Sequence, residues 1–356
     1  MRRKLGLAAL AILLPLLGSL LFNVLRHLVF WSPSEEVVFE SGEIRLAGTL
    51  VKPAEEGSFP AVLMLHGSGP EPRSDPPTRA VMNTLVRHGF AVLAYDKRGV
   101  DASGGDFKSA SYGDFIDDAL AALDYLAARD DIDGTRLGLY CVSESGWFGP
   151  EIASRSQSVD FIFNKVGPAV SWVETVSWEV RNDTLADGIA EEDVDQFVDL
   201  ARRQWSYYRA VAADPSLLRG PEREAIEAEM VRIRAEVPGA DRILGETLPE
   251  ADLEAYQAFA AQASYDPTPY LRGLDIPLHY AYASEDINVP TDRCLAALTR
   301  LTDEQGKPIT LTVYISVGHS LATWRGLLSA GFPPGYLDSV GTWASEQVGG
   351  TSRSSG

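Results

Sequence analysis

Short, predominantly apolar runs recur along this chain, and segments with a helical pattern separate most of them. The runs lie at 61–65, 90–95, 137–142, 161–166, 277–283 and 309–315. A run without polar alternation is typical of a strand that is buried on both faces. Strands that alternate with helices form a parallel sheet with helices on both sides. The sequence therefore predicts an α/β fold with a mostly parallel central sheet.

The segments around these runs predict a hairpin and several helices. Residues 37–52 indicate a hairpin with its turn at Ser41-Gly42, and residues 78–88 indicate a helix before the second run. Residues 111–129 indicate another helix, because one face of it would be apolar, with Phe115, Ile116, Ala119, Leu120, Leu123 and Leu126. We assign residues 35–167 and 267–347 to one α/β core.

The pattern changes between 171 and 264, where no convincing strand occurs and helical periodicity prevails. We expect residues 168–266 to form a helical cap insertion over the sheet edge where α/β proteins bind ligands. The aromatic residues of the insertion are expected to pack it against the core. They are Trp172, Trp178, Trp205, Tyr207 and Tyr208.

Residues 1–31 differ from the rest of the chain and predict a membrane anchor or a signal peptide. Three basic residues precede an apolar run at 5–22. As a helix this run would span about 27 Å, close to the thickness of a bilayer core. Positive charge before the run predicts a cytoplasmic N-terminus and an exported body. No clear cleavage site follows, which favours an uncleaved N-terminal hydrophobic helix at the membrane; a cleaved signal peptide would release a secreted protein.

The charge balance and the cysteines narrow the range of partners. The formal net charge is −19, from 50 acidic and 31 basic residues. This balance argues against a nucleic-acid partner, because nothing in the chain resembles a basic stripe that could neutralise phosphates. Only Cys141 and Cys294 occur, so the sequence predicts neither a disulfide framework nor a metal-ligand cluster. The Gly/Ser-rich residues 348–356 predict a disordered tail.

One serine lies between a predicted strand and a predicted helix. Residues 138–147 read Gly-Leu-Tyr-Cys-Val-Ser-Glu-Ser-Gly-Trp, with Ser143 at the turn. A serine at such a turn stands above the sheet with backbone N–H groups beside it, which suits an activated nucleophile. The usual pattern is G-x-S-x-G, and here Cys141 and Ser145 stand in place of the glycines. These ten residues alone fit a serine at a helix N-cap equally well.

A nucleophilic serine needs a base and a carboxylate that orients the base. Of the five histidines, His319 lies on a loop after the last apolar run, a suitable place for a catalytic base. Asp286, on the loop after the preceding run, is our candidate for the acid. Glu285 is its nearest competitor, and Asp292 is a poorer one inside the next helix. The order Ser143, Asp286, His319 thus predicts a catalytic triad.

Several separated motifs resemble those of the α/β-hydrolase superfamily, in particular its bacterial branch related to dienelactone hydrolases and serine aminopeptidases. They lie within residues 37–345 and comprise the loops at 66–69 (His-Gly-Ser-Gly), 96–105 (Asp-Lys-Arg-Gly…Ser-Gly-Gly), 142–146, 285–290 and 318–319. The resemblance implies the α/β-hydrolase fold, with a variable cap that sets specificity. It also implies oxyanion donors at the backbone N–H groups of Ser68 and Glu144, and a largely structural role for the loop at 96–105.

The predicted function is that of a serine hydrolase that cleaves a carboxylic ester, or a thioester or amide, of a small acyl substrate. The predicted chemistry needs neither a metal nor an organic cofactor. A serine aminopeptidase, an acyltransferase and an inactive, membrane-tethered binding protein of the same fold stay open as alternatives. The sequence assigns no substrate-binding residues and no oligomeric state.

Overall fold

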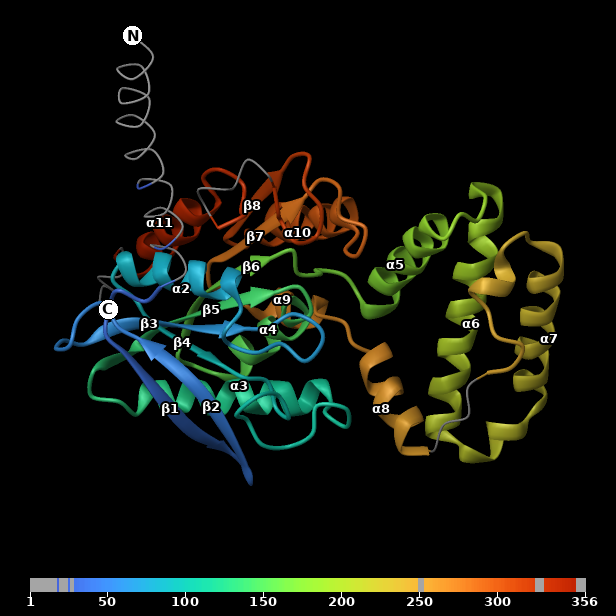
Figure 1. Cartoon of the computed structure of the whole chain (residues 1–356), viewed down its shortest axis with the longest axis horizontal. Coiled ribbons are helices and arrows are strands. Elements are labelled where there is room, and N and C mark those ends of the chain that lie inside the picture. Colours follow the sequence, from blue (N-terminus) through green and yellow to red (C-terminus); the bar gives the residue numbers. More distant parts are fainter. Residues whose placement is uncertain (1–17, 19–24, 26–28, 249–252, 324–329, 350–356) are drawn as a thin grey trace, which may run out of the picture.

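A computed structural model describes residues 18, 25, 29–248, 253–323 and 330–349. In this part of the chain one sheet has eight strands: β1 (Ser34–Ser41), β2 (Ile44–Val51), β3 (Phe59–Leu65), β4 (Ala91–Tyr95), β5 (Ile132–Val142), β6 (Val159–Lys165), β7 (Leu278–Ala283) and β8 (Ile309–Tyr314). Their order in the sheet is β1-β2-β4-β3-β5-β6-β7-β8 (Figure 1). β1 and β2 form an antiparallel hairpin, β2 is antiparallel to β4, and the strands from β3 to β8 run parallel.

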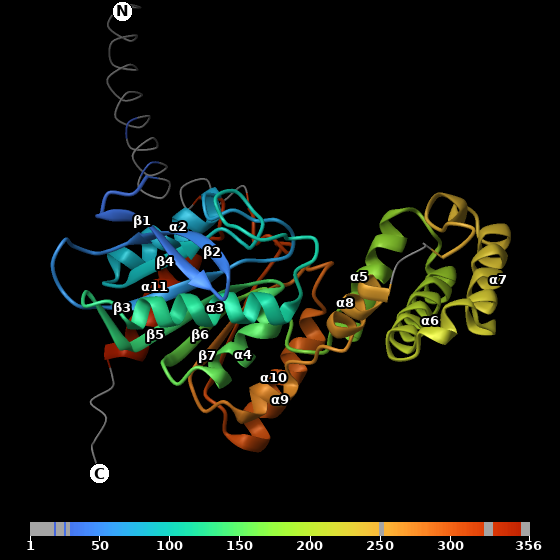
Figure 2. The same ribbon diagram turned by 90° about the horizontal axis from the view of Figure 1, so that it is seen from below.

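Helices cover both faces of this sheet (Figure 2). One face packs against α2 (Pro76–Arg87) and α11 (Tyr336–Gly349). The opposite face packs against α3 (Tyr112–Ala127), α4 (Ser145–Arg155), α9 (Thr268–Gly273) and α10 (Thr291–Gln305). The side chains of β3 alternate between the two apolar clusters, as the period of two requires. Burial on both faces therefore explains why successive side chains of β3 are apolar on both sides of the sheet.

Each predicted apolar run coincides with a strand, so the mostly parallel α/β sheet is confirmed. β5 differs most from its prediction, because it begins at Ile132, five residues before the apolar run at 137–142. The four residues after Ile132 are polar or glycine, and none of them is buried, so they lack the apolar signal of a strand.

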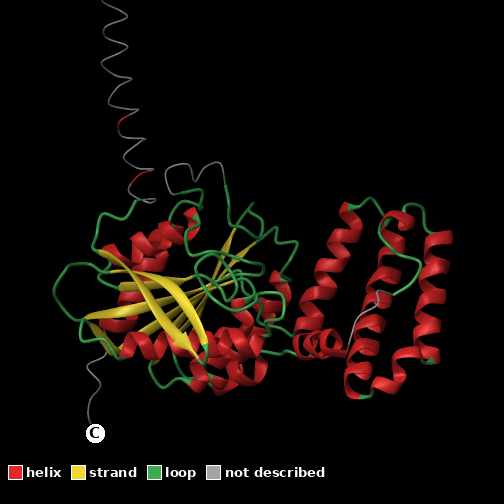
Figure 3. Ribbon diagram, turned by 60° about the horizontal axis from the view of Figure 1, so that its bottom comes forward, coloured by secondary structure: helices red, strands yellow, loops and turns green. Residues whose placement is uncertain are grey.

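The segment between β6 and β7 is helical. Its helices are α5 (Trp172–Ala186), α6 (Val194–Ala213), α7 (Pro221–Glu236) and α8 (Leu253–Ala263), with short 3₁₀-helices at Glu191–Asp193, Pro215–Arg219 and Ala240–Arg242. No strand occurs at 168–248 or 253–266, the described parts of the predicted insertion (Figure 3). Trp172 packs edge-on against Trp205, with their ring centroids 5.1 Å apart, and both residues belong to the apolar cluster on one face of the sheet. Tyr207 instead packs within a second cluster inside the insertion.

The predicted terminal segments lie mostly outside the described residues. This holds for the apolar run at 5–22, apart from Gly18, and for residues 350–356 of the predicted tail. At the C-terminus, α11 continues to Gly349, two residues into the segment that we predicted to be disordered. Among the described helices, none combines the length and the apolar composition that a membrane span requires.

Candidate active site

Ser143 occupies a sharp turn between β5 and α4. β5 ends at Val142 and α4 begins at Ser145, so two residues reverse the chain. Ser143 has φ = +49°, a left-handed conformation that a residue with a Cβ rarely adopts. Two backbone hydrogen bonds hold it there: its N–H donates to Lys165 O at 2.9 Å, and its carbonyl accepts from Gly146 N at 2.8 Å. The turn thus has the strained form of a nucleophile elbow.

The structure brings Ser143, His319 and Asp286 together in one chain of hydrogen bonds. Ser143 Oγ lies 2.8 Å from His319 Nε2, and His319 Nδ1 lies 2.9 and 3.0 Å from the two carboxylate oxygens of Asp286. In the tautomer that satisfies both contacts, Nδ1 donates to Asp286 and Nε2 accepts from Ser143. The three residues follow β5, β7 and β8, whose carboxyl ends meet at one sheet edge.

The carboxylate of Asp286 is completely buried and has further donors besides His319. Its Oδ1 accepts hydrogen bonds from the backbone N–H groups of Asn288 and Val289, each at 2.9 Å. The two competing acids lie elsewhere: Glu285 and Asp292 are both exposed. The structure therefore selects Asp286 as the partner of His319.

The other three described histidines have structural positions. His88 follows α2 and bonds to Thr84 O at 2.9 Å, and His279 is buried in β7. His66 is buried at the end of β3, where its Nε2 contacts Tyr95 O. His27 lies outside the described residues.

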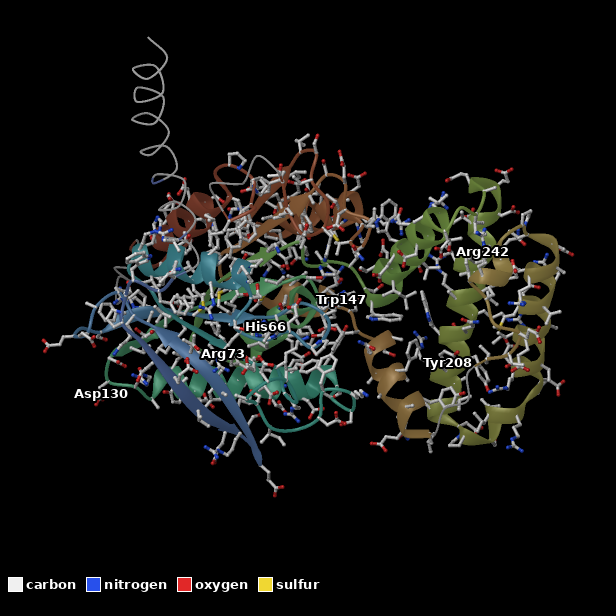
Figure 4. The ribbon with its side chains drawn as sticks, viewed as in Figure 1. His66, Arg73, Asp130, Trp147, Tyr208 and Arg242 are labelled. Carbon is white, nitrogen blue, oxygen red and sulfur yellow. The ribbon has the colours of Figure 1, made fainter. Side chains whose placement is uncertain are left out.

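A cavity of about 280 Å³ opens above Ser143 and His319. Its walls come from the core and from the insertion, and Trp147 lies on the side of the core that faces the insertion (Figure 4). Ser68 and Glu144, the two residues whose N–H groups we expected to hold the oxyanion, also line this cavity. The remaining lining residues are Tyr112, Pro168, Trp172, Thr175, Val176, Glu179, Gln262, Asn288 and Val289.

Helix α5 of the insertion holds the loop that carries Asp286. Trp178 Nε1 donates to Asp286 O at 3.1 Å, and Asn182 Nδ2 donates to Ile287 O at 2.9 Å. Asn288 Nδ2 donates to Glu179 Oε1 at 2.8 Å. These contacts could not be expected from the sequence, because nothing in the pattern of an isolated helix shows which loop its polar side chains will reach.

The two departures from glycine at the elbow are both accommodated. The Ser145 side chain is completely buried, and its hydroxyl accepts from Val142 N at 2.7 Å. Cys141 is also completely buried, and its Sγ lies beside Gly149, where an added Cβ would come within 2.5 Å of the sulfur. Burial raises the pKa of the Cys141 thiol, so this sulfur is a packing group.

A buried ion pair lies directly behind the elbow. Glu144 follows the nucleophile, and its carboxylate lies 2.9 Å from the ammonium of Lys97. Burial raises the pKa of the Glu144 carboxyl, while Lys97 acts in the opposite direction. From the sequence we expected Lys97 only as part of a structural loop. A lysine two residues after a buried strand is the signal that could have drawn attention to it. Among the described residues, no group of His, Cys, Asp and Glu side chains could hold a metal ion.

A serine, a histidine and a buried carboxylate in this geometry, at the edge of a parallel sheet, define a serine hydrolase site. The family X-Pro dipeptidyl-peptidase (S15 family) matches residues 41–320, and the chain therefore belongs to this family. The resemblance to the α/β-hydrolase superfamily is thus confirmed.

Solved structures share the fold at low sequence identity. The DcsB complex with its substrate analogue is 17% identical, with a TM-score of 0.56, over 89% of this chain and 100% of that chain. The esterase Pf2001 of Pyrococcus furiosus is 15% identical, with a TM-score of 0.56, over 90% and 92% of the two chains. A hypothetical protein of Pseudomonas aeruginosa is 15% identical, with a TM-score of 0.55, over 90% and 95%. No curated protein matches the chain.

Proposed function

We propose that the protein hydrolyses carboxylic esters of small acyl substrates through an acyl-enzyme on Ser143. The observation that carries this proposal is the continuous hydrogen-bond chain from Ser143 through His319 to Asp286 at the floor of a cavity. The family description, X-Pro dipeptidyl-peptidase, supports hydrolysis at this site, and the ester bond is the part that we propose.

In the proposed mechanism, Ser143 Oγ attacks the substrate carbonyl carbon and its proton passes to His319 Nε2. Asp286 orients His319 and stabilises the imidazolium, while the backbone N–H groups of Ser68 and Glu144 hold the oxyanion. His319 then gives the proton to the leaving group, and the acyl-enzyme forms. Water attacks this ester with His319 as the base, which releases the acid and restores Ser143.

A peptidase is the second candidate, and one residue of the cavity favours it. Glu179 lines the cavity and has no salt-bridge partner among the described residues. Within the described part of the chain, its carboxylate accepts a single hydrogen bond, from the Asn288 amide as noted above. The ammonium of a peptide N-terminus would find an unpaired carboxylate there, as the family description X-Pro dipeptidyl-peptidase also suggests.

Turnover by the full-length protein tests both candidates. The substrates are p-nitrophenyl esters of short and medium acyl chains, and Gly-Pro-p-nitroanilide with a free or an acetylated amino group. We expect ester hydrolysis that falls by at least about 10⁴-fold in Ser143→Ala and is unchanged in Ser154→Ala, an exposed serine of the same helix. Faster cleavage of the free anilide than of any ester would favour the peptidase, and no turnover of either class would refute both.

The predicted location is a separate proposal. Because the apolar run at 5–22 lies outside the described residues but for Gly18, the expectation of an anchored, extracytoplasmic enzyme stays a prediction from sequence. Fractionation of cells that produce the full-length chain tests it: recovery in the soluble cytoplasmic fraction would refute the prediction.

A further inference from the structure

The ammonium group of Lys97 contacts the chain next to both backbone donors that the proposed mechanism requires. Lys97, two residues after β4, is 4% exposed. Its Nζ donates to Gly67 O at 2.5 Å, to Gly69 O at 3.1 Å and to Glu144 Oε2 at 2.9 Å. These acceptors belong to two loops, the one after β3 and the one after β5. Lys97 therefore links the loop that carries Ser68 to the residue that follows Ser143.

The contact with Gly67 controls the direction of the Ser68 N–H. The carbonyl of Gly67 and the N–H of Ser68 belong to the same planar trans peptide and point in opposite directions. If the ammonium holds the carbonyl, it also fixes the N–H toward the opposite side, and Ser68 lines the cavity together with Ser143. The N–H of Gly67 is held as well, because it donates to Glu71 Oε2 at 2.9 Å.

The contact with Glu144 fixes the second donor. Glu144 is 8% exposed and stands at the start of α4, so its backbone N–H lies at the elbow beside Ser143. The ammonium also lies over the rings of Phe115 and Phe107, at 4.8 and 5.5 Å. Three oxygen acceptors and two aromatic faces leave the ammonium little freedom to move.

We propose that Lys97 is a positioning residue that sets the geometry of the oxyanion site through Gly67 and Glu144. This inference rests on the proposed function, since it concerns the donors of the same reaction. The competing explanation is that Lys97 only neutralises the buried carboxylate of Glu144, in which case its contacts with the two glycine carbonyls have no effect on catalysis.

Two variants separate these explanations. Lys97→Met leaves Glu144 buried without its cation, so it is expected to lower both stability and kcat. Lys97→Met/Glu144→Gln removes the unpaired charge as well, and it is expected to recover thermal stability. If Lys97 positions the donors, kcat of the double variant stays about 10²-fold below wild type while KM changes little. Lys108→Met, an exposed lysine of the same loop region, is the matched control.

A trifluoromethyl ketone gives a readout that a purely structural role would not change. Ser143 adds to this ketone and forms a hemiketal oxyanion, which needs the same two donors. We expect its inhibition constant to rise about as many fold in the double variant as kcat falls. The corresponding secondary alcohol forms no oxyanion, and its affinity is expected to stay within a factor of about 3, the usual effect of a small packing change. Wild-type kcat or wild-type ketone affinity in the double variant would overturn the inference.

The rate of Ser143 labelling by a fluorophosphonate separates this inference from the proposed function. If wild type is labelled but cleaves no ester, the proposed function fails, and the labelling rate of the double variant then tests Lys97. A slower rate in the double variant supports the positioning role, and an equal rate overturns it. If Ser143 of the folded wild-type protein is not labelled at all, both proposals are wrong.

Discussion

Replacing Ser145 with alanine removes a single hydroxyl group from the interior of the elbow. Ser145 Oγ accepts from Val142 N at 2.7 Å, and its single proton can go to Val142 O at 3.0 Å or to Leu65 O at 3.2 Å. Val142 and Leu65 are the last residues of the neighbouring strands β5 and β3. The hydroxyl therefore satisfies the last backbone N–H of β5 beside the end of β3, and it does so in a completely buried position.

The contacts give the expected size of the effect. Alanine would leave Val142 N and one carbonyl, Val142 O or Leu65 O, without this partner, and a buried donor left unpaired costs about 1–3 kcal/mol. The acceptor adds less, because a carbonyl tolerates a lost hydrogen bond better than an N–H does. We therefore expect Ser145→Ala to lower the free energy of unfolding by about 2 kcal/mol. Ser145→Gly is expected to lose a further ~0.5–1 kcal/mol, because glycine gains more backbone freedom on unfolding.

Urea unfolding of the full-length protein, followed by tryptophan fluorescence, measures these differences. Wild type is expected to be the most stable, Ser145→Ala less stable and Ser145→Gly the least, with m-values unchanged. Ser154→Ala, on the exposed face of the same helix, controls for the loss of a hydroxyl as such. A glycine variant as stable as wild type would refute the argument. It would mean that Ser145 is merely tolerated at a position where glycine serves equally well.

Three further predictions concern the acid, the buried histidine and the thiols. Asp286→Asn is expected to lower kcat for ester hydrolysis by about 10⁴-fold, because the amide cannot stabilise the imidazolium of His319. Asp292→Asn changes an exposed carboxylate and is expected to match wild type in the same assay. Burial lowers the pKa of His279 to about 4, so the unfolded chain binds a proton below pH 6.5 that the native protein does not. Wild type is therefore expected to lose about 1–2 kcal/mol more stability than His279→Gln between pH 7 and pH 5, measured by urea unfolding; an equal loss would show that His279 titrates normally. Cys141 and Cys294 are completely buried, and burial raises the pKa of Cys294 to about 12. We therefore expect neither thiol to react with a disulfide reagent at pH 8 before urea is added. Prompt reaction of the folded protein would contradict this.

The sheet could be predicted from sequence because its central strands are buried on both faces. Such strands are predominantly apolar, and β3 and β7 were located to within two residues at each end. The three triad positions followed from topology, since loops that follow parallel strands meet at one edge. The chain order placed the acid between Ser143 and His319, where Asp286 was our candidate and Glu285 its nearest competitor. The structure places only Asp286 against His319.

The supporting contacts of the site could not be predicted in the same way. Lys97 and Glu144 are 47 residues apart, and the Trp178 contact with Asp286 spans 108 residues. Each depends on the side-chain conformation of a polar residue whose local pattern fits an exposed position equally well. Parallel topology brings the loops to the same edge, but packing decides which side chains meet there.

The glycines of the usual elbow motif are there because neighbouring backbone segments approach closely at the turn. The turn needs close approach of backbone, and here Gly146 and Gly167 provide it: a Cβ on Gly146 would lie 2.4 Å from Gly167 Cα. On the strand side, Cys141 occupies room that Gly149 leaves free on α4. The glycine that makes room on this side of the elbow thus lies on the helix and not on the strand, while Ser143 keeps its left-handed conformation. Because the geometry at the nucleophile is preserved by different residues, the loss of the usual glycines argues for a repacked elbow and not for an inactive one.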